Sequence, residues 1–235
     1  EKSKDQKMPN ASTTKILTAL CAIKYGDLDQ VITVSENACD MASDSSVCKL
    51  KPGDQLTLRQ LLYGLLLRSG NDAAIAIAEG ISGDVASFAK LMNQEANSLG
   101  ATHSNFVNPN GLQDKNHYTC AYDMYLIFHA AVAEDEFVDI IHSSNYDAYY
   151  KDISGNPVEQ KWTTTNQYVN GFRSNPDGIT VIGGKTGTTG EAGYCLVLYS
   201  QNANHEPLIS MVYGADCRGN LYLLMNEILS KYGNQ

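Results

Sequence analysis

The chain has 235 residues, and its content of 43% hydrophobic and 18% charged residues is that of an ordinary globular protein. The formal net charge of −9 argues against a nucleic-acid partner, which requires a basic face, and against binding an anionic membrane by charge. No apolar run approaches the roughly 18 residues of a transmembrane helix. No basic segment followed by an apolar run marks a signal peptide, which we therefore expect to be already absent.

The first half of the sequence is dominated by apolar residues at helical spacing. In the first such stretch Ile16, Leu20 and Ile23 share one face, and Gly26 ends the pattern. Asp84 is a typical N-cap residue, and further along Gly100 is a typical residue after a helix end. These patterns predict helices over 12–25, 58–66, 72–80, 84–99 and 119–133, a short strand over 31–34, and an ordered loop over 103–118.

Strand patterns follow after residue 144. Ser154 to Pro157 is a turn signal typical of a hairpin. The remaining predictions are strands over 145–150, 179–187, 193–200 and 207–214 and a closing helix over 221–232. This order indicates an α+β fold of one domain, 1–235, in which a helical lobe (about 36–143) packs on an antiparallel sheet lobe formed by the remainder.

The cysteines do not form a metal or redox motif, because no C-x-x-C pair occurs. Cys39 and Cys48 flank a short polar loop, and we expect them to be the disulfide pair if one forms. The alternative for each cysteine is a small buried apolar residue.

Three short motifs carry chemistry: Ser12-Thr-Thr-Lys15, Ser69-Gly-Asn71 and Lys185-Thr-Gly187. Each is weak alone, but together and in this order they form the acyl-transfer set of class A β-lactamases and penicillin-binding proteins. The set predicts a nucleophile, a base and a clamp for the substrate.

In the first motif, Ser12 and Lys15 lie on one face of a predicted helix, with the serine in the first turn, near free backbone N–H groups. A serine hydroxyl becomes a good nucleophile when a neighbour takes its proton. Lys15 can do so if burial and a second cation, for which Lys185 is the candidate, lower its pKa. An isolated S-x-x-K would instead indicate an N-cap serine and a surface lysine.

In the second motif, Ser69 and Asn71 occupy a break between two apolar helices, where polar groups need partners or a task. Ser69 can relay a proton between Lys15, Lys185 and a leaving amine. Asn71 can hold Lys15 and bind a substrate amide. Without the other motifs, S-G-N would indicate a turn between helices.

In the third motif, small residues surround Lys185 at the end of a predicted strand, so a substrate backbone can lie close to the strand edge. Lys185, Thr186 and Thr188 offer a cation and two hydroxyls to a substrate carboxylate, with Gly187 between them. The backbone N–H groups of Thr188 and Ser12 are the candidate oxyanion hole. A phosphate-binding loop is not indicated, because its glycine spacing is absent.

The histidines show no metal-ligand pattern such as H-E-x-x-H, and we predict that they are structural or surface residues. We expect His117 to tether its loop. No G-x-S-x-G elbow supports a Ser-His-Asp triad.

Four longer segments, three of which contain the motifs, resemble the serine-type D-alanyl-D-alanine carboxypeptidases, the low-molecular-weight penicillin-binding proteins. The resemblance rests on MPNASTTKILTAL, LRQLLYGLLLRSGNDAAIAIAE, FAKLMNQEANSLGATHSNFVNPNGLQDKNHYT and GGKTGTTGEAGYCLV. It implies a β-lactamase/transpeptidase-like fold, extracytoplasmic action on peptidoglycan stem peptides ending in D-Ala-D-Ala, and acylation by β-lactams. It also implies that the reaction needs no metal or other cofactor.

The same resemblance implies roles for individual residues. Ser12 is the acylated nucleophile, Lys15 its base, and Ser69 the third catalytic residue. Substrate binding falls to Asn71 and to the segment 185–188, that is Lys185, Thr186, Gly187 and Thr188.

Two departures from the family pattern are expected to matter. Only eleven residues precede Ser12, so the leading strands of the family are missing from this chain, and its C-terminal β-rich domain and membrane anchor are missing as well. The stretch from Gly171 to Gly183 is longer than usual, and Arg173 is a candidate for binding the substrate carboxylate.

Other functions stay open at this point. A class A β-lactamase normally has S-D-N, where position 70 here is Gly, and needs a loop glutamate in E-x-x-L-N, which does not occur between 72 and 184. A penicillin-sensing or peptidoglycan-binding module would not need the complete acylation set. The motifs do not separate a carboxypeptidase from a DD-endopeptidase or transpeptidase.

Overall fold

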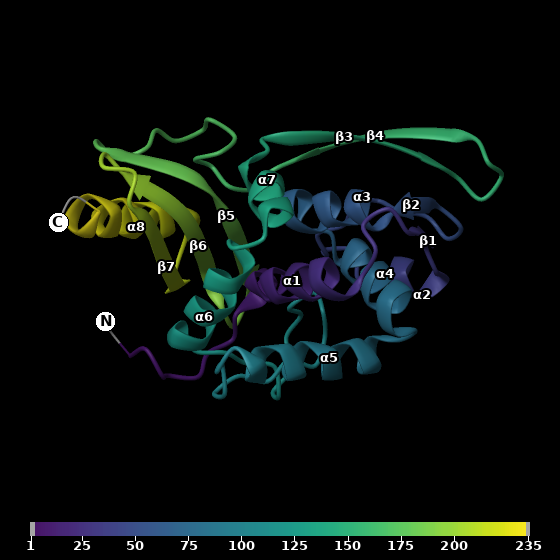
Figure 1. Cartoon of the computed structure of the whole chain (residues 1–235), viewed down its shortest axis with the longest axis horizontal. Coiled ribbons are helices and arrows are strands. Elements are labelled where there is room, and N and C mark those ends of the chain that lie inside the picture. Colours follow the sequence, from purple (N-terminus) through teal and green to yellow (C-terminus); the bar gives the residue numbers. More distant parts are fainter. Residues whose placement is uncertain (1–2, 234–235) are drawn as a thin grey trace.

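A helical part and a three-stranded sheet with one helix on its outer face make up the molecule (Figure 1). The computed structural model describes residues 3–233. The helices are η1 (Ala11–Thr14, 3₁₀), α1 (Lys15–Tyr25), α2 (Glu36–Cys39), α3 (Leu58–Tyr63), η2 (Gly64–Arg68, π), α4 (Asn71–Ser82), α5 (Val85–Ser98), α6 (Ala121–Ala131), α7 (Asp135–His142) and α8 (Arg218–Tyr232). The strands are β1 (Val31–Thr33), β2 (Gln55–Thr57), β3 (Asn145–Lys151), β4 (Pro157–Thr163), β5 (Ile179–Thr189), β6 (Gly193–Asn202) and β7 (Pro207–Ala215). The α+β prediction is confirmed.

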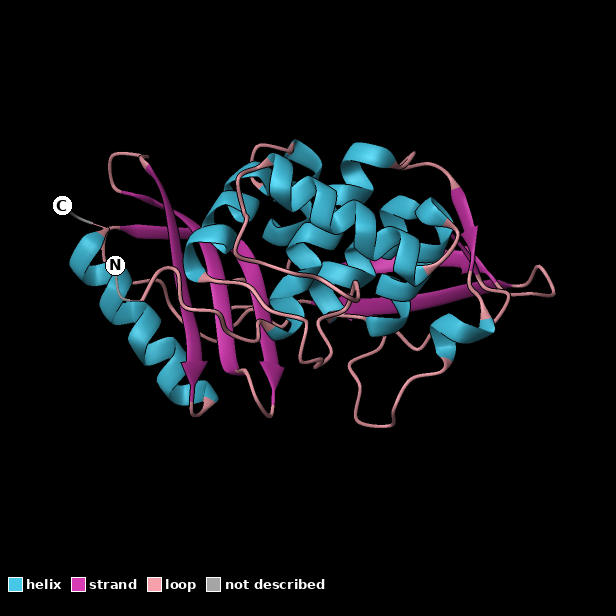
Figure 2. Cartoon of the chain, turned by 90° about the horizontal axis from the view of Figure 1, so that it is seen from below, coloured by secondary structure: helices cyan, strands magenta, loops and turns pink. Residues whose placement is uncertain are grey.

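The strands form two sheets rather than one. Strands β5, β6 and β7 are antiparallel neighbours in chain order, and a bulge between Val181 and Gly183 shifts the register of β5 against β6. Strands β1 to β4 form a separate sheet, whose β3–β4 hairpin runs along the helical part (Figures 1 and 2). The segments 31–34 and 145–150, which we expected in the sheet lobe, therefore lie beside the helices.

Helix α1 passes through the middle of the helical part and carries the nucleophile motif at its start (Figure 1). Every residue from Lys15 to Ala22 is buried, which is expected of a helix that is apolar all round. Helices α4, α5 and α6 all contact it. The start of α1 is thus held by the main core of the protein.

A second core joins α8 to the three-stranded sheet. Leu221, Met225 and Leu229 of α8 are almost fully buried against apolar residues of β5 to β7. This packing gives the sheet one covered face, while η1, α6 and α7 contact its strands from the helical part. Strand β5 therefore lies beside the beginning of the nucleophile helix.

Most of the predicted helices and strands are present, but their ends are shifted. Asp84 caps α5 through its side chain, and Gly100, with φ +84°, follows the helix end as predicted. The closing helix begins earlier than predicted, at Arg218, because the Cys217 side chain caps it. Helix α7 was not predicted, because eight residues offer too short a periodic pattern.

No disulfide joins Cys39 and Cys48, the pair that we expected if one formed, since both thiols are free. The Cys39 thiol donates to the carbonyl of Leu50 at 3.3 Å. The Cys48 sulfur fills the space beside Gly64 and Gly70, where an added Cβ would lie 2.6 and 2.4 Å from it. Cys48 is therefore a buried packing residue, as the alternative interpretation stated.

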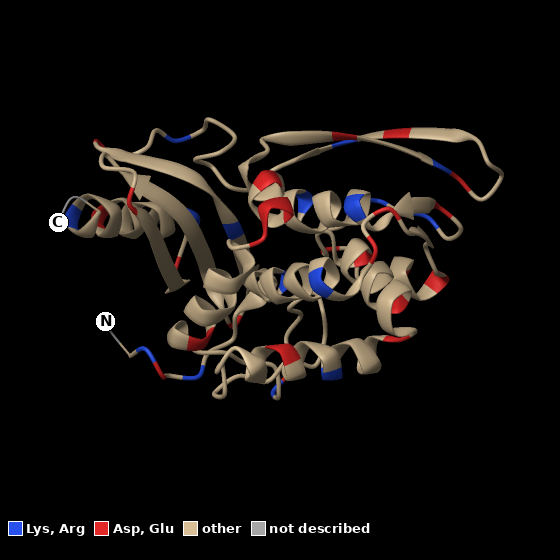
Figure 3. Cartoon of the chain, viewed as in Figure 1, with Lys and Arg blue, Asp and Glu red and all other residues tan. Residues whose placement is uncertain are grey.

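Charged residues of both signs are spread along the helices and loops, and in this view Lys and Arg do not gather in one region (Figure 3). Among residues 3–233, no helix is long and apolar enough to cross a membrane.

Candidate active site

Ser12 lies in the 3₁₀ turn η1, directly before α1 and half-buried. The Thr13 hydroxyl donates to the carbonyl of Asn10 at 2.6 Å and lies 3.1 Å from the Tyr213 hydroxyl, which ties this turn to β7. A Cβ built on Gly187 would lie 3.0 Å from the Ser12 nitrogen, so β5 can approach the nucleophile turn because this residue is glycine.

The Lys15 amine makes three contacts at the bottom of the site. Its Nζ lies 2.7 Å from Asn71 Oδ1, 2.6 Å from the carbonyl oxygen of Asn110 and 2.9 Å from Ser12 Oγ. The two carbonyl oxygens can only accept, so they use two N–H groups of the amine. If the amine is neutral, its lone pair therefore remains to accept the proton of the Ser12 hydroxyl.

The surroundings of Lys15 favour this neutral form. The side chain is 0% exposed, and burial lowers its pKa well below the ordinary lysine value, with the nearby Lys185 charge lowering the pKa further. Both causes were expected from the sequence. The Asn110 carbonyl was not, because a backbone contact across 95 residues leaves no side-chain signal.

Ser69 lies at the end of the π-helical turn η2, in a left-handed backbone conformation with φ +62°. This conformation is unusual for a non-glycine residue, and π-helical turns often mark functional sites. The Ser69 hydroxyl accepts from Lys185 Nζ at 2.9 Å. The helix break predicted at 69–71 is confirmed: α4 starts at Asn71, whose backbone N–H donates to the carbonyl of Ser46.

Lys185 enters the site from β5 and is 1% exposed. Besides Ser69, its Nζ donates to the carbonyl of Thr186 at 2.9 Å. Burial lowers the pKa of Lys185 to about 7. Near neutral pH this side chain can therefore hold or release a proton beside Ser69.

A cavity of about 470 Å³ opens over these residues. Ser12, Ser69 and the segment 186–188 line it, and Thr165 opposite β5 places its hydroxyl 2.6 Å from that of Thr186. The far end is lined by Phe172 and Arg218, among others. The structure thus brings all eight residues singled out in the sequence together at one cavity or directly beneath it.

Comparison with known proteins agrees with this geometry. Residues 1–217 match the family model described as D-alanyl-D-alanine carboxypeptidase. The chain belongs to the D-alanyl-D-alanine carboxypeptidase family. The recognition from the sequence motifs is confirmed.

Relatives and solved structures in this family show how far the similarity extends. D-alanyl-D-alanine carboxypeptidase DacF of Bacillus subtilis is 33% identical over 91% of this chain and 53% of its own length. DacC of Escherichia coli is 35% identical over 92% of this chain and 52% of its own length. The crystal structure of the Streptomyces K15 DD-transpeptidase superposes with a TM-score of 0.89 at 29% identity, covering 99% of this chain and 90% of that one. The chain spans about half the length of these two curated relatives.

Arg218, rather than the predicted Arg173, lines the cavity of this family member. Arg173 donates to Gln167 Oε1 at 2.8 Å and lies over the Tyr222 ring, 4.8 Å from its centroid, so its guanidinium is already engaged. Arg218 is exposed at the first position of α8. Sequence reasoning missed it because it is 33 residues beyond Lys185 (218 − 185), and only the packing of α8 on the sheet brings it to the site.

His117 is the loop tether that we predicted. Its Nδ1 accepts from the Val107 N–H at 3.2 Å, which leaves the proton on Nε2 to donate to Thr14 Oγ1 at 2.8 Å. Burial lowers its pKa to about 4, so the ring is neutral at physiological pH. The tether holds the loop that carries Asn110 against the start of α1.

Proposed function

We propose that the chain is a serine DD-carboxypeptidase that removes the terminal D-alanine from peptidoglycan stem peptides outside the cytoplasm. The observation that carries this proposal is the hydrogen bonding of Lys15, which leaves a lone pair for the hydroxyl of Ser12. A general base within hydrogen-bond reach and with a lowered pKa is what an acylating serine requires.

The reaction follows from these contacts. Lys15 Nζ takes the Ser12 proton while Oγ attacks the carbonyl carbon between the two D-alanines, and the backbone N–H groups of Ser12 and Thr188 stabilise the resulting oxyanion. The C–N bond then breaks, and the Ser69 hydroxyl passes a proton to the leaving D-alanine amine, with Lys185 replenishing it. Water hydrolyses the acyl-enzyme and regenerates Ser12.

Substrate binding is assigned to the other side of the cavity. Asn71 holds Lys15 and binds the stem-peptide amide. The substrate lies along β5, with its terminal carboxylate facing the hydroxyls of Thr186 and Thr188. β-Lactams would enter the same cavity and acylate Ser12.

A class A β-lactamase activity is less well supported. Rapid deacylation in that class needs a glutamate that activates water, and among the described residues no carboxylate lines the cavity. The acyl-enzyme formed with a β-lactam is therefore expected to be long-lived.

The proposal is tested by D-alanine release from a peptide ending in Lys-D-Ala-D-Ala. We expect release by the parent chain and none by the Ser12→Ala variant, because no other serine hydroxyl in the cavity contacts Lys15. Adding an amine acceptor and measuring transpeptidation product separates hydrolysis from transfer. Equal release by Ser12→Ala, or release by neither protein when both are folded, would refute the proposal.

A second prediction concerns Arg218, which we assign to binding the terminal carboxylate of the substrate because it lines the cavity. Removing the exposed cation in Arg218→Ala is expected to lower kcat/KM by about 10- to 100-fold, the usual effect of losing a hydrogen bond to a charged group. On a peptide whose terminal carboxylate is amidated, Arg218→Ala should have nearly the same kcat/KM as the parent. Arg173→Ala is the matched control, and an equal loss in both variants would contradict the assignment.

A further inference from the structure

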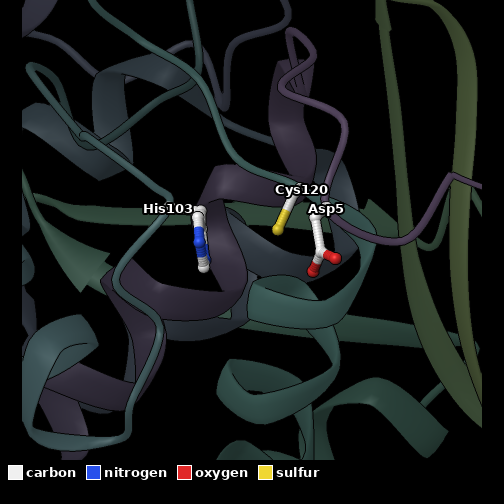
Figure 4. Close-up of side chains that lie close together, drawn as sticks. All are labelled: Asp5, His103 and Cys120. Atoms are coloured by element: carbon white, nitrogen blue, oxygen red, sulfur yellow. The ribbon is translucent and has the colours of Figure 1, made fainter.

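A second cluster of reactive side chains lies outside the cavity. Asp5, His103 and Cys120 come from three separate segments and converge, and their ligand atoms lie within 4.8 Å of one another (Figure 4). None of the three lines the cavity over Ser12. No sequence motif marks this cluster, because its members are 98 and 17 residues apart (103 − 5 and 120 − 103).

Backbone hydrogen bonds bring these segments together. Met8 and Thr119 form an antiparallel bridge, and the Tyr122 N–H donates to the carbonyl of Lys4 at 3.0 Å. Asn105 bridges Tyr118 in the same way. The arrangement of the cluster is therefore a consequence of the fold rather than of three mobile side chains.

An independent observation indicates a missing partner at this place. Asp123 is 0% exposed, and its Oδ2 accepts from the His103 N–H and from the Ser104 hydroxyl, both at 2.7 Å. Its Oδ1 is buried without a hydrogen-bond partner among the described residues and lies 3.6 Å from His103 Nδ1. Buried carboxylate oxygens are rarely left in this state, so the cluster lacks a positive charge.

We propose that Asp5, His103 and Cys120 bind a zinc ion, with Asp123 orienting the histidine. Imidazole nitrogen, thiolate sulfur and carboxylate oxygen are the ligands that zinc prefers. Nδ1 of His103 faces Asp123 Oδ1 at 3.6 Å, and a small turn of the ring would let its N–H donate to that oxygen. Nε2 is then left for the metal, which is the usual carboxylate–histidine–zinc arrangement. The Cys120 thiol gives its proton to solvent on binding, and water completes the tetrahedron.

The geometry requires only a small closing movement. Tetrahedral zinc places its ligand atoms about 3.3–3.8 Å apart, so the widest separation within the cluster has to close by roughly an ångström. The Cys120 sulfur caps α6, accepting from the Asp123 N–H at 3.5 Å. Burial raises the pKa of the Cys120 thiol, so the charge of the metal itself has to stabilise the thiolate. The metal would join the segment before Ser12 to α6 and would take no part in the reaction at Ser12.

The test uses the 235-residue chain, reduced and freed of metal, titrated with zinc against a chromophoric chelator and separately with cobalt(II). We expect a single equivalent to bind and a sulfur-to-cobalt charge-transfer band to appear. His103→Ala and Asp5→Asn, both exposed positions, should each weaken zinc binding by at least about tenfold. Cys120→Ser should abolish the charge-transfer band.

Two matched controls keep the test specific. His205→Ala removes another exposed histidine, and Cys217→Ser removes another thiol that caps a helix. Both should bind zinc as the parent does. No binding at micromolar zinc, a cobalt complex without the charge-transfer band, or unchanged affinity in His103→Ala would each overturn the proposal, and the two exposed variants decide it if Cys120→Ser fails to fold.

Discussion

Replacing Lys15 by methionine is expected to slow acylation of Ser12 by about 10²- to 10⁴-fold, the usual contribution of a general base. Methionine has a similar length and suits a buried position, but it has no lone pair of comparable basicity for the serine proton. The rate is measured as the second-order constant for acylation by a chromogenic or fluorescent penicillin. The first-order acylation rate at saturating penicillin should fall by a similar factor, because the lost base acts in the chemical step rather than in binding.

The control for this variant is Lys90→Met, which removes an exposed lysine from α5. Lys15→Met also leaves the oxygens of Asn71 and Asn110 without their donor, so its folding has to be checked by circular dichroism and thermal unfolding. A folded Lys15→Met protein that is acylated within a few-fold of the parent rate would mean that another group takes the Ser12 proton.

The second large effect is on stability. The pKa of Lys185 is lowered to about 7 in the folded protein, while an unfolded lysine has a pKa of roughly 10.4. Between these values the unfolded chain binds a proton that the folded chain does not, so the free energy of unfolding rises with pH by about 1.4 kcal/mol per unit. The gain in the free energy of unfolding is complete above the pKa of the unfolded lysine, and it is lost as the pH falls toward about 7.

Comparison with Lys185→Met isolates this effect. Urea unfolding at about pH 7.5 and about pH 9.5 should show the parent gaining roughly 2–3 kcal/mol relative to the variant over that interval. Lys15, whose pKa is also lowered, makes the free energy of unfolding rise with pH in both proteins. The Lys185 charge helps to lower the pKa of Lys15, so this rise is smaller in the Lys185→Met variant. If the difference in the free energy of unfolding between parent and variant does not change with pH, Lys185 is not buried as described. The control Lys90→Met should show the same pH dependence as the parent.

Much of the site could be predicted from the sequence because its side chains come from short motifs with fixed spacing. A serine and a lysine three apart on a helix must share a face, and S-G-N between two apolar helices must form a break. Their meeting with Lys185 depends on the packing of β5 against η1, which periodicity does not encode. It could be inferred only from the combination of the three motifs.

The features of the site that the sequence did not predict depend on backbone contacts or on long-range packing. The Asn110 carbonyl reaches Lys15 through a loop held by His117, and Arg218 reaches the cavity through the packing of α8. The π-helical turn before Ser69 has the same apolar sequence as an ordinary helix. Residues 145–163 alternate as strands do, but nothing in the alternation says which of two sheets they join.

The most direct test of the account is the intact mass of the folded chain after treatment with benzylpenicillin, followed by peptide mapping. The account predicts a single penicilloyl adduct on Ser12 and no adduct on Ser12→Ala. The adduct should persist, because no carboxylate within residues 3–233 lines the cavity to activate water. An unshifted mass, or an adduct on any other residue, would contradict the assignment of Ser12 as the nucleophile.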